Sequence, residues 1–259
     1  MQLTLYQIDA FAEKVFEGNP AAVCPLEHWL PDELMQAIAL ENNLSETAFF
    51  VKTDSGYHIR WFTPSCEIAL CGHATLASAY VIVNYLNDQS PVIVFECQSG
   101  ALKVTQKDDR FEMDFPAQPP KPCEIPKQIL KAFTQTPSAC WQSEDYIVVF
   151  DSEQDVLNAQ PDLNQLSQLD LRGVIITAPS KQYDFVNRVF APKYGISEDP
   201  VTGSAFTQLI PYWADQLGKS SLSAKQVSQR GGEVYGQLLG DRVMISGKAT
   251  LYMVATIKV

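Results

Sequence analysis

Arg60-Trp61-Phe62-Thr63-Pro64 returns as Arg188-Val189-Phe190-Ala191-Pro192, about half a chain length later in these 259 residues. Each copy is followed by a glycine that opens an apolar helical stretch, Gly72 in the first half and Gly203 in the second. The order of helix, strand, strand and glycine-led helix therefore recurs. We expect two homologous lobes related by a pseudo-two-fold axis, with both helix starts facing a cleft between them. Helix N-termini present unpaired N–H groups and partial positive charge, so this pair suits a small carboxylate.

The predicted boundary between the lobes is a proline-rich stretch. Five prolines lie between Pro116 and Pro126, which excludes helix and central strand and favours an extended connector. We expect an N-terminal lobe of residues 1–116, joined by the last strand at about 248–259, and a C-terminal lobe of residues 117–247. Each lobe should hold several strands around one apolar helix, at Gly72 to Leu86 and at Gly203 to Leu217. A further helix is predicted from Pro31 to Asn42.

Charge and composition exclude several classes of protein. A net charge of −11 disfavours nucleic acid and anionic membrane surfaces as partners. The N-terminal residues lack the pattern of a signal peptide, and no stretch is apolar for about 18 residues. The six cysteines are scattered without a Cys-x-x-Cys pair, and the spacing of Cys66, Cys71 and His73 fits no common zinc motif. We expect a cytoplasmic protein with reduced thiols, no metal and no cofactor.

Glu46 is the first candidate for chemistry. It stands at the mouth of the apolar strand Thr47-Ala48-Phe49-Phe50-Val51, where partial desolvation would suit a carboxyl to proton transfer near neutral pH. The repeat has no acid at the corresponding place, near Gly173 or Val174, so the fold itself does not require one. The plainer alternative is that Glu46 ends a strand in water.

The two helix starts carry the other candidates. His73 follows Gly72, and an imidazole there can hydrogen-bond an anion or shuttle a proton, although a lone histidine at a helix start is more often a cap or a packed ring. At the second start, Ser204 offers a hydroxyl in the first turn, whereas Asp199 either faces a ligand or only caps the helix. No esterase elbow, Walker loop or dinucleotide fingerprint is present.

Five blocks together resemble the PhzF phenazine-biosynthesis family, in the family's order and over essentially the whole chain. They are Asp9-Ala10-Phe11, Gly18 to Val23, Ser45 to Phe49, Cys71 to Thr75 and Glu198 to Ala205. The resemblance implies the diaminopimelate-epimerase-like fold, an α+β fold with two pseudo-symmetric lobes, each a barrel-like, mostly antiparallel sheet around a central helix. It also implies cofactor-independent isomerisation of a small carboxylate substrate, and it is compatible with a homodimer.

The resemblance also implies roles for particular residues. The family's proton-carrying glutamate matches Glu46, and His73 and Asp199 match residues that assist it in the same pocket. The matched blocks assign substrate binding to Asn19, Ser45, Gly72, Gly203 and Ser204.

Two departures from related patterns leave alternatives open. Epimerases and racemases of this fold use a cysteine at each helix start, but the second start here reads Asp199-Pro200, which disfavours an amino-acid epimerase or racemase. The block Val227 to Glu233 differs from the pattern of many family members, so the substrate stays open. A non-catalytic small-ligand-binding or interaction protein is the third alternative, and a shielded Glu46 would argue against it.

Overall fold

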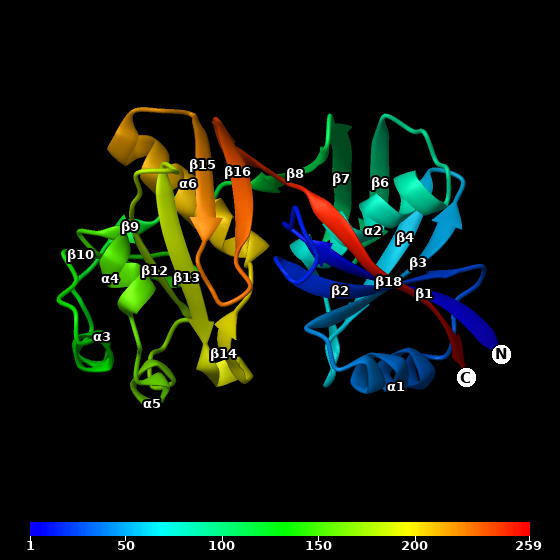
Figure 1. Cartoon of the computed structure of the whole chain (residues 1–259), viewed down its shortest axis with the longest axis horizontal. Coiled ribbons are helices and arrows are strands. Elements are labelled where there is room, and N and C mark those ends of the chain that lie inside the picture. The colour runs from blue at the N-terminus through cyan, green and yellow to red at the C-terminus, as the bar shows by residue number, and fades with distance from the viewer. The chain divides into compact units, whose positions relative to one another are not determined.

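The computed structural model describes all residues, 1–259, and divides into two compact units. Unit 1 comprises Met1–Asp114 together with Ser246–Val259, and unit 2 comprises Phe115–Ile245. The chain passes from unit 1 to unit 2 just before the proline-rich stretch. Each unit combines curved, mostly antiparallel strands with a few helices (Figure 1), so the fold is α+β as predicted. None of the helices has both the length and the apolar character needed to cross a bilayer.

Unit 1 contains nine strands and two helices. Its elements are β1 (Gln2–Ala10), β2 (Asn19–Leu26), α1 (Asp32–Asn42), β3 (Glu46–Thr53), β4 (Gly56–Phe62), β5 (Glu67–Ile68), α2 (Gly72–Tyr85), β6 (Val92–Cys97), β7 (Gly100–Lys107), β8 (Arg110–Pro116) and β18 (Ala249–Lys258). β18 pairs antiparallel with β1, so the end of the chain closes the sheet that its beginning started.

Unit 2 is built from shorter elements. They are β9 (Lys121–Pro122), α3 (Lys127–Ala132), β10 (Ala139–Gln142), β11 (Tyr146–Val149), α4 (Glu153–Asn158), α5 (Leu163–Leu166), β12 (Val174–Pro179), β13 (Phe185–Ala191), the 3-10 turn η1 (Pro192–Tyr194), β14 (Ile196–Asp199), α6 (Gly203–Leu217), β15 (Ser221–Gln226), β16 (Gly232–Leu239) and β17 (Arg242–Gly247). The short helices α3 and α4 and strand β14 are absent from the elements that the sequence predicted, whereas α5 lies just after Pro161-Asp162, where the repeat predicts a helix.

The two units share one order of strand pairing, which confirms the internal repeat. In unit 1, β1–β2 is antiparallel, β2–β3 parallel, β3–β4 antiparallel, β4–β6 parallel and β6–β7 antiparallel. In unit 2, β10, β11, β12, β13, β15 and β16 follow the same alternation. Each parallel pair is joined by a crossover that contains a helix, as a parallel connection requires.

The repeated Arg-x-Phe-x-Pro motif makes the same contacts in each unit. Arg60 donates from Nε and Nη2 to the two carboxylate oxygens of Glu67, at 2.8 and 2.7 Å. Arg188 does the same to Glu198, at 2.7 and 2.9 Å. Each guanidinium also lies over the ring of the phenylalanine two residues on, at 5.2 and 5.1 Å from its centroid. The motif therefore ties a long strand to the short strand before each glycine-led helix, through a bidentate pair.

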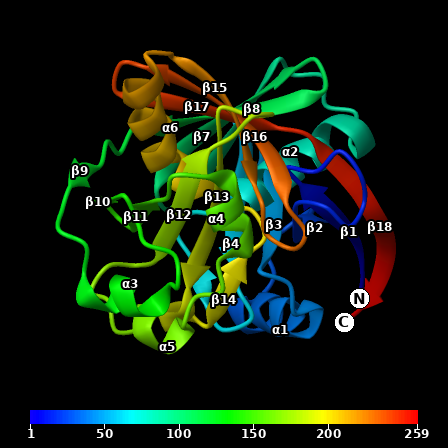
Figure 2. The ribbon, with the colours of Figure 1, turned by 60° about the vertical axis from the view of Figure 1, so that its left-hand side comes forward.

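Each unit has one central helix, α2 or α6, and most residues of each are buried. α2 packs against β1, β2, β3 and β18, and α6 against β15 and β16 (Figure 2). α1 packs on β3 through a separate cluster that includes Met35, Ile38 and Phe49. A helix that is apolar nearly all round can only be accommodated inside its sheet, which is what the sequence of both stretches predicts.

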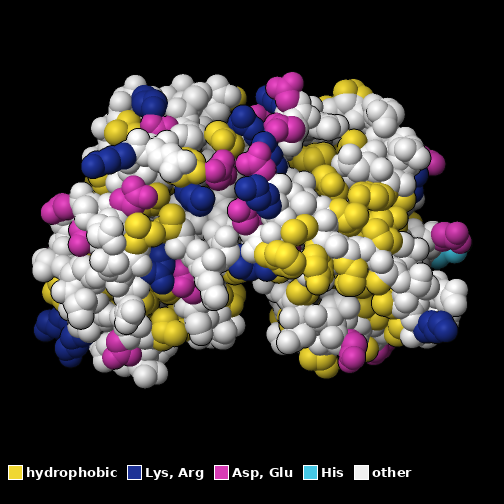
Figure 3. All heavy atoms as spheres, in the orientation of Figure 1, with side chains coloured by type: hydrophobic (Ala, Val, Ile, Leu, Met, Phe, Trp, Pro, Cys, Tyr) yellow, Lys and Arg dark blue, Asp and Glu magenta, His cyan; other side chains and the backbone are white.

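Unit 1 exposes apolar side chains along β18. Tyr252, Met253 and Val254 are exposed in succession, and the ring of exposed Phe16 lies 5.7 Å from that of Tyr252. Figure 3 shows hydrophobic side chains gathered over the part of unit 1 where β18 and β1 run. Neighbouring exposed apolar groups are common at protein contact surfaces. A homodimer, with which the family resemblance is compatible, stays a prediction.

Alanine substitutions at two glycines with nearly equal φ can distinguish the cost of steric overlap from the cost of backbone strain. Gly18 has φ +68° and Gly240 has φ +63°, but a Cβ at Gly18 would meet the Ala10 carbonyl oxygen at 2.1 Å, whereas nothing lies within 4 Å at Gly240. We expect Gly240→Ala to cost about 1–2 kcal/mol, the strain of the left-handed region. Gly18→Ala should cost roughly 1–3 kcal/mol more, from overpacking against a fixed backbone. Urea unfolding of both variants measures the difference, and equal costs would contradict the overlap.

Candidate active site

Glu46 is the first residue of β3, and β3 lies parallel to β2 with Glu46 paired to Ala21. Its side chain is 16% exposed, so the carboxyl group is largely shielded and does not simply end a strand in water. The corresponding first residue of β12 is Val174, which confirms that the repeat carries no acid there. Glu46 is therefore an addition to the scaffold and not a part of it.

His73 brings an imidazole to this carboxyl. It is the second residue of α2, its side chain is 8% exposed, and its Nε2 lies 3.2 Å from Oε2 of Glu46. The two atoms are close, but no well-aligned hydrogen bond joins them. Burial lowers the pKa of His73 to about 4, so the ring is neutral at pH 7. The contact is therefore one between a carboxyl group and a neutral imidazole, and it is not an ion pair.

Cys71 lies at the other end of the same ring. It is the buried N-cap residue of α2, and its Sγ is 3.4 Å from Nδ1 of His73. The sequence did not assign Cys71 to the site. The signals for it were its place next to Gly72, at a helix start where related epimerases carry a catalytic thiol, and its place in the matched block Cys71 to Thr75.

The same three groups are the only described set of histidine, cysteine and acidic side chains close enough to hold a metal ion. Their potential ligand atoms all lie within 4.8 Å of one another. However, Glu46 approaches Nε2 and Cys71 approaches Nδ1, whereas an ion would bind the ring through one nitrogen. The arrangement is a row of carboxyl, imidazole and thiol, which fits proton movement better than chelation.

Both helix starts leave backbone donors for a ligand. Gly72 and Gly203 are the first residues of α2 and α6, and neither N-cap residue, Cys71 or Thr202, makes a side-chain cap. The carboxylate of Asp199 accepts a hydrogen bond from Oγ1 of Thr202, the N-cap residue of α6, at 2.5 Å. The first N–H groups of both helices are thus available to an anion.

A buried amide in unit 2 positions Asp199 and the start of α6. Gln226 is fully buried, donates to the backbone oxygen of Asp199 at 2.7 Å and accepts from the backbone N–H of Thr202 at 3.0 Å. Asn187 in turn donates to the Gln226 side chain at 3.1 Å. Polar groups on three strands therefore fix the turn that holds Asp199, and nothing in the sequence singled out these two amides.

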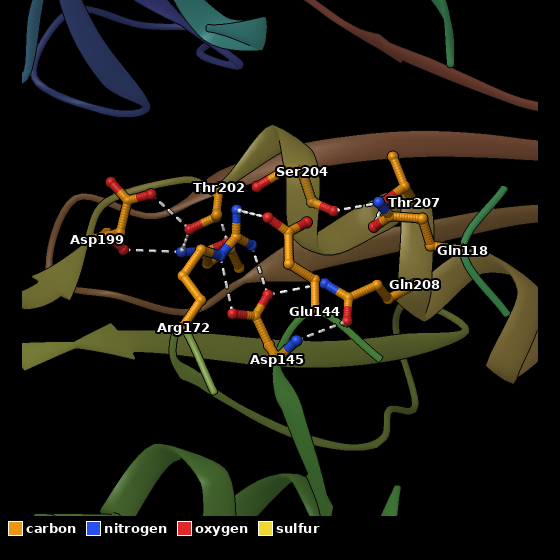
Figure 4. Close-up of polar contacts among 10 residues, drawn as sticks. Gln118, Glu144, Asp145, Arg172, Asp199, Thr202, Ser204, Thr207 and Gln208 are labelled. Atoms are coloured by element: carbon orange, nitrogen blue, oxygen red, sulfur yellow. Dashed lines mark hydrogen bonds and ion pairs between the residues drawn. The ribbon is translucent and has the colours of Figure 1, made fainter. Parts of the chain in front are cut away.

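A second buried network supports α6 from below (Figure 4). Asp145, 1% exposed, accepts from Arg172 Nε at 2.9 Å and from Gln208 Nε2 at 2.7 Å, and its own N–H donates back to Gln208. The other side of Arg172 meets Glu144 at 3.1 Å. Gln208 belongs to α6, so the network joins the helix to the loop before β11. Sequence reasoning missed all four residues.

The remaining predicted site residues lie near these groups in the chain. Asn19 is the first residue of β2 and is 1% exposed; it lies two residues before Ala21, which pairs with Glu46. Ser45 directly precedes Glu46 in the chain. Ser204 is half-buried in the first turn of α6, where its carbonyl accepts from Thr207. A groove in unit 2, lined by Pro211, Gly218 and Leu238, lies toward the opposite end of α6 and is not part of this site.

Comparisons with known proteins agree with this fold. The family described as phenazine biosynthesis-like protein matches residues 8–255. A Pseudomonas aeruginosa protein named as an uncharacterized isomerase is 52% identical over 257 residues, 99% of both chains. The crystal structure of a PhzF-family protein of Enterococcus faecalis superimposes with a TM-score of 0.98 at 46% identity, covering 100% of both chains.

A more distant likeness reaches a hydroxyproline epimerase of Agrobacterium vitis, with a TM-score of 0.62 at 13% identity over 99% of this chain and 92% of that one, and shows the fold alone. The class is thus the diaminopimelate-epimerase-like fold. Within it, the chain belongs to the PhzC-PhzF family, the phenazine biosynthesis-like proteins.

The lowered pKa of His73 predicts an acid-labile fold. Between about pH 4 and pH 6.5 the unfolded chain protonates this imidazole and the folded chain does not, so stability falls as pH falls through that window and levels off below it. We expect the loss to be a few kcal/mol in the wild type and smaller in His73→Gln, measured by urea unfolding across the pH range. Exposed His28 is the control. His28→Gln should keep the wild-type slope, and an unchanged slope in His73→Gln would contradict the prediction.

Proposed function

We propose that this protein is a cofactor-independent isomerase of the PhzF type, which moves a proton between two carbon atoms of a small carboxylate substrate. The observation that carries the proposal is the shielded carboxyl of Glu46 beside the neutral ring of His73, 3.2 Å away. A largely shielded carboxyl beside a buried histidine is typical of a functional site, and the scaffold does not need an acid at this position.

The proposed reaction uses Glu46 as the general base and then as the general acid. Glu46 takes a proton from one substrate carbon, the electron pair left behind shifts through the adjoining double bond, and Glu46 returns the proton to another carbon. Substrate and product have the same atoms, so neither an oxidant nor a second substrate is needed. In this proposal Gly72 supplies helix N–H donors for the substrate carboxylate, and Asn19 and Ser45 also bind the substrate. Binding by Gly203 and Ser204, and assistance by Asp199, stay predictions from the sequence.

Two other functions fit the observations less well. A two-thiol epimerase or racemase needs a cysteine at each helix start, and β14 ends in Asp199 where the second would be required. A binding protein without turnover has no use for a shielded carboxyl next to a neutral imidazole, since an ionised group facing an anionic ligand would weaken binding.

Deuterium incorporation tests the proposal directly. The purified protein is incubated in D₂O with a panel of small unsaturated carboxylates, and recovered compounds are analysed by mass spectrometry and proton NMR. We expect at least one compound to gain deuterium at carbon, with an isomer appearing at the same time. Binding of a panel member, seen as a thermal shift, without any exchange would favour the binding protein. Exchange with inversion at a single carbon would favour the epimerase.

A further inference from the structure

The thiol of Cys71 is the partner in the only hydrogen bond that the His73 ring makes. The ring contacts Cys71 Sγ at Nδ1, 3.4 Å away, while its Nε2 faces Glu46 without a well-aligned hydrogen bond. The backbone of Cys71 is itself fixed, because Thr75 donates to its carbonyl from both Oγ1, at 2.6 Å, and the backbone N–H, at 3.2 Å. The backbone of Cys71, from which the thiol extends, is therefore held by the first turn of α2.

A neutral imidazole carries one proton, and its hydrogen-bond partner decides which nitrogen holds it. If Cys71 keeps the ordinary thiol pKa of about 8.5, its sulfur carries a proton at neutral pH. A protonated thiol that points at Nδ1 donates to that nitrogen, which must then be without a proton. The remaining ring proton is placed on Nε2, the nitrogen that faces Glu46.

We propose that Cys71 is a positioning residue, which holds His73 as the Nε2–H tautomer so that the ring presents a donor to the carboxyl of Glu46. Cys71 acts through His73 and needs no contact with the substrate. This role differs from that of a thiol that itself carries the substrate proton.

The tautomer of His73 affects how Glu46 returns the proton to the substrate. This step rests on the proposed isomerase function. When Glu46 is ionised, the Nε2–H of His73 favours the carboxylate and keeps it ready as a base. When Glu46 has taken a proton, an Nε2 that already carries hydrogen cannot accept it. The proton therefore stays on Glu46 until it returns to the substrate, as an internal transfer requires.

Packing alone is the rival explanation for a buried thiol, and Cys24 provides the matched control. Cys24 is also buried in unit 1, but its Sγ donates to the backbone oxygen of Thr4 at 3.5 Å and contacts no titratable side chain that the structure describes. Burial raises its pKa to about 12, as expected of a thiol used as a small apolar group. If Cys71 had only this role, the two cysteines would respond alike to substitution.

Nitrogen-15 NMR of histidine side chains tests the tautomer without reference to any reaction. The chain has three histidines, and His73→Gln assigns the His73 signals by their loss. Protonated and bare ring nitrogens resonate in well-separated ranges. At pH 7 we expect wild-type His73 to be protonated at Nε2 alone. Cys71→Ala should give a mixture of tautomers, Cys71→Ser should restore Nε2–H because its hydroxyl also donates, and Cys24→Ala should match the wild type.

The outcomes separate this inference from the proposed function. A wild-type Nδ1–H tautomer, a Cys71→Ala spectrum like the wild type, or the same change in Cys24→Ala would overturn the role of Cys71. If the tautomer depends on Cys71 but no carboxylate exchanges deuterium, the inference holds and the isomerase proposal fails. With an exchanging compound in hand, Cys71→Ala should lower kcat by roughly tenfold, less than the loss expected on removing a general acid–base, with KM little changed and Cys71→Ser recovering part of the loss.

Discussion

Glu46→Gln is expected to lower deuterium exchange into the substrate by about 10²-fold or more, while the substrate still binds. Removal of a general acid–base typically costs 10²–10⁴-fold in rate. Glutamine keeps the size and most of the hydrogen bonding of glutamate but cannot titrate, so binding through the helix N–H groups should survive. Exchange is measured by mass spectrometry under saturating substrate, and binding by calorimetry with the same compound.

A control variant tests whether the effect is specific to the carboxyl of Glu46 or follows the loss of any glutamate. Glu41 is an exposed glutamate near the end of α1, and Glu41→Gln removes the same charge from the chain without touching the His73 contact. It should exchange at the wild-type rate. A Glu46→Gln protein that exchanges as fast as the wild type would remove Glu46 from the mechanism and leave a binding protein as the better account.

Features that repeat along the chain could be predicted from the sequence. The repeated Arg-x-Phe-x-Pro motif predicted two units correctly, because the contacts of each copy are local. Arg60 forms a bidentate pair with a glutamate seven residues further on, and Arg188 with one ten residues further on. Gly72 and Gly203 could be recognised as helix starts because the signal is also local. Each glycine directly precedes a run of apolar residues with helical spacing. Glu46 stood out because its neighbours are apolar and its counterpart is not acidic.

Features that depend on distant partners could not be predicted. Asp145 and Arg172 lie 27 residues apart, and Asp145 and Gln208 lie 63 apart, so no spacing rule links them. Each looks like an ordinary surface residue in the sequence. The contact of Cys71 with His73 spans only two residues, but it depends on the extended backbone of Cys71 before the first helical turn, with φ −143° and ψ 112°. A helical Cys71 would point its thiol elsewhere.

The buried Asp145 network predicts a large and specific loss of stability. Asp145→Ala should destabilise unit 2 by about 3–5 kcal/mol, because it leaves Arg172 without its buried partner and the buried amide of Gln208 without an acceptor. Urea unfolding followed by tryptophan fluorescence, with amide hydrogen exchange of α6, measures the loss and shows where it occurs. Protection of α2 in unit 1 should change little.

Glu144 supplies the matched control for the same guanidinium. It meets Arg172 at 3.1 Å, but its side chain is 41% exposed whereas that of Asp145 is 1% exposed. An exposed ion pair contributes about 0–1 kcal/mol, since water and salt screen it. Glu144→Ala should therefore cost at most about 1 kcal/mol, although both variants remove one carboxylate from Arg172. Equal costs would show that burial of Asp145 is not what makes the network strong. A large loss confined to Asp145→Ala would show that Arg172 and Gln208 depend on one buried carboxylate to join α6 to the loop before β11.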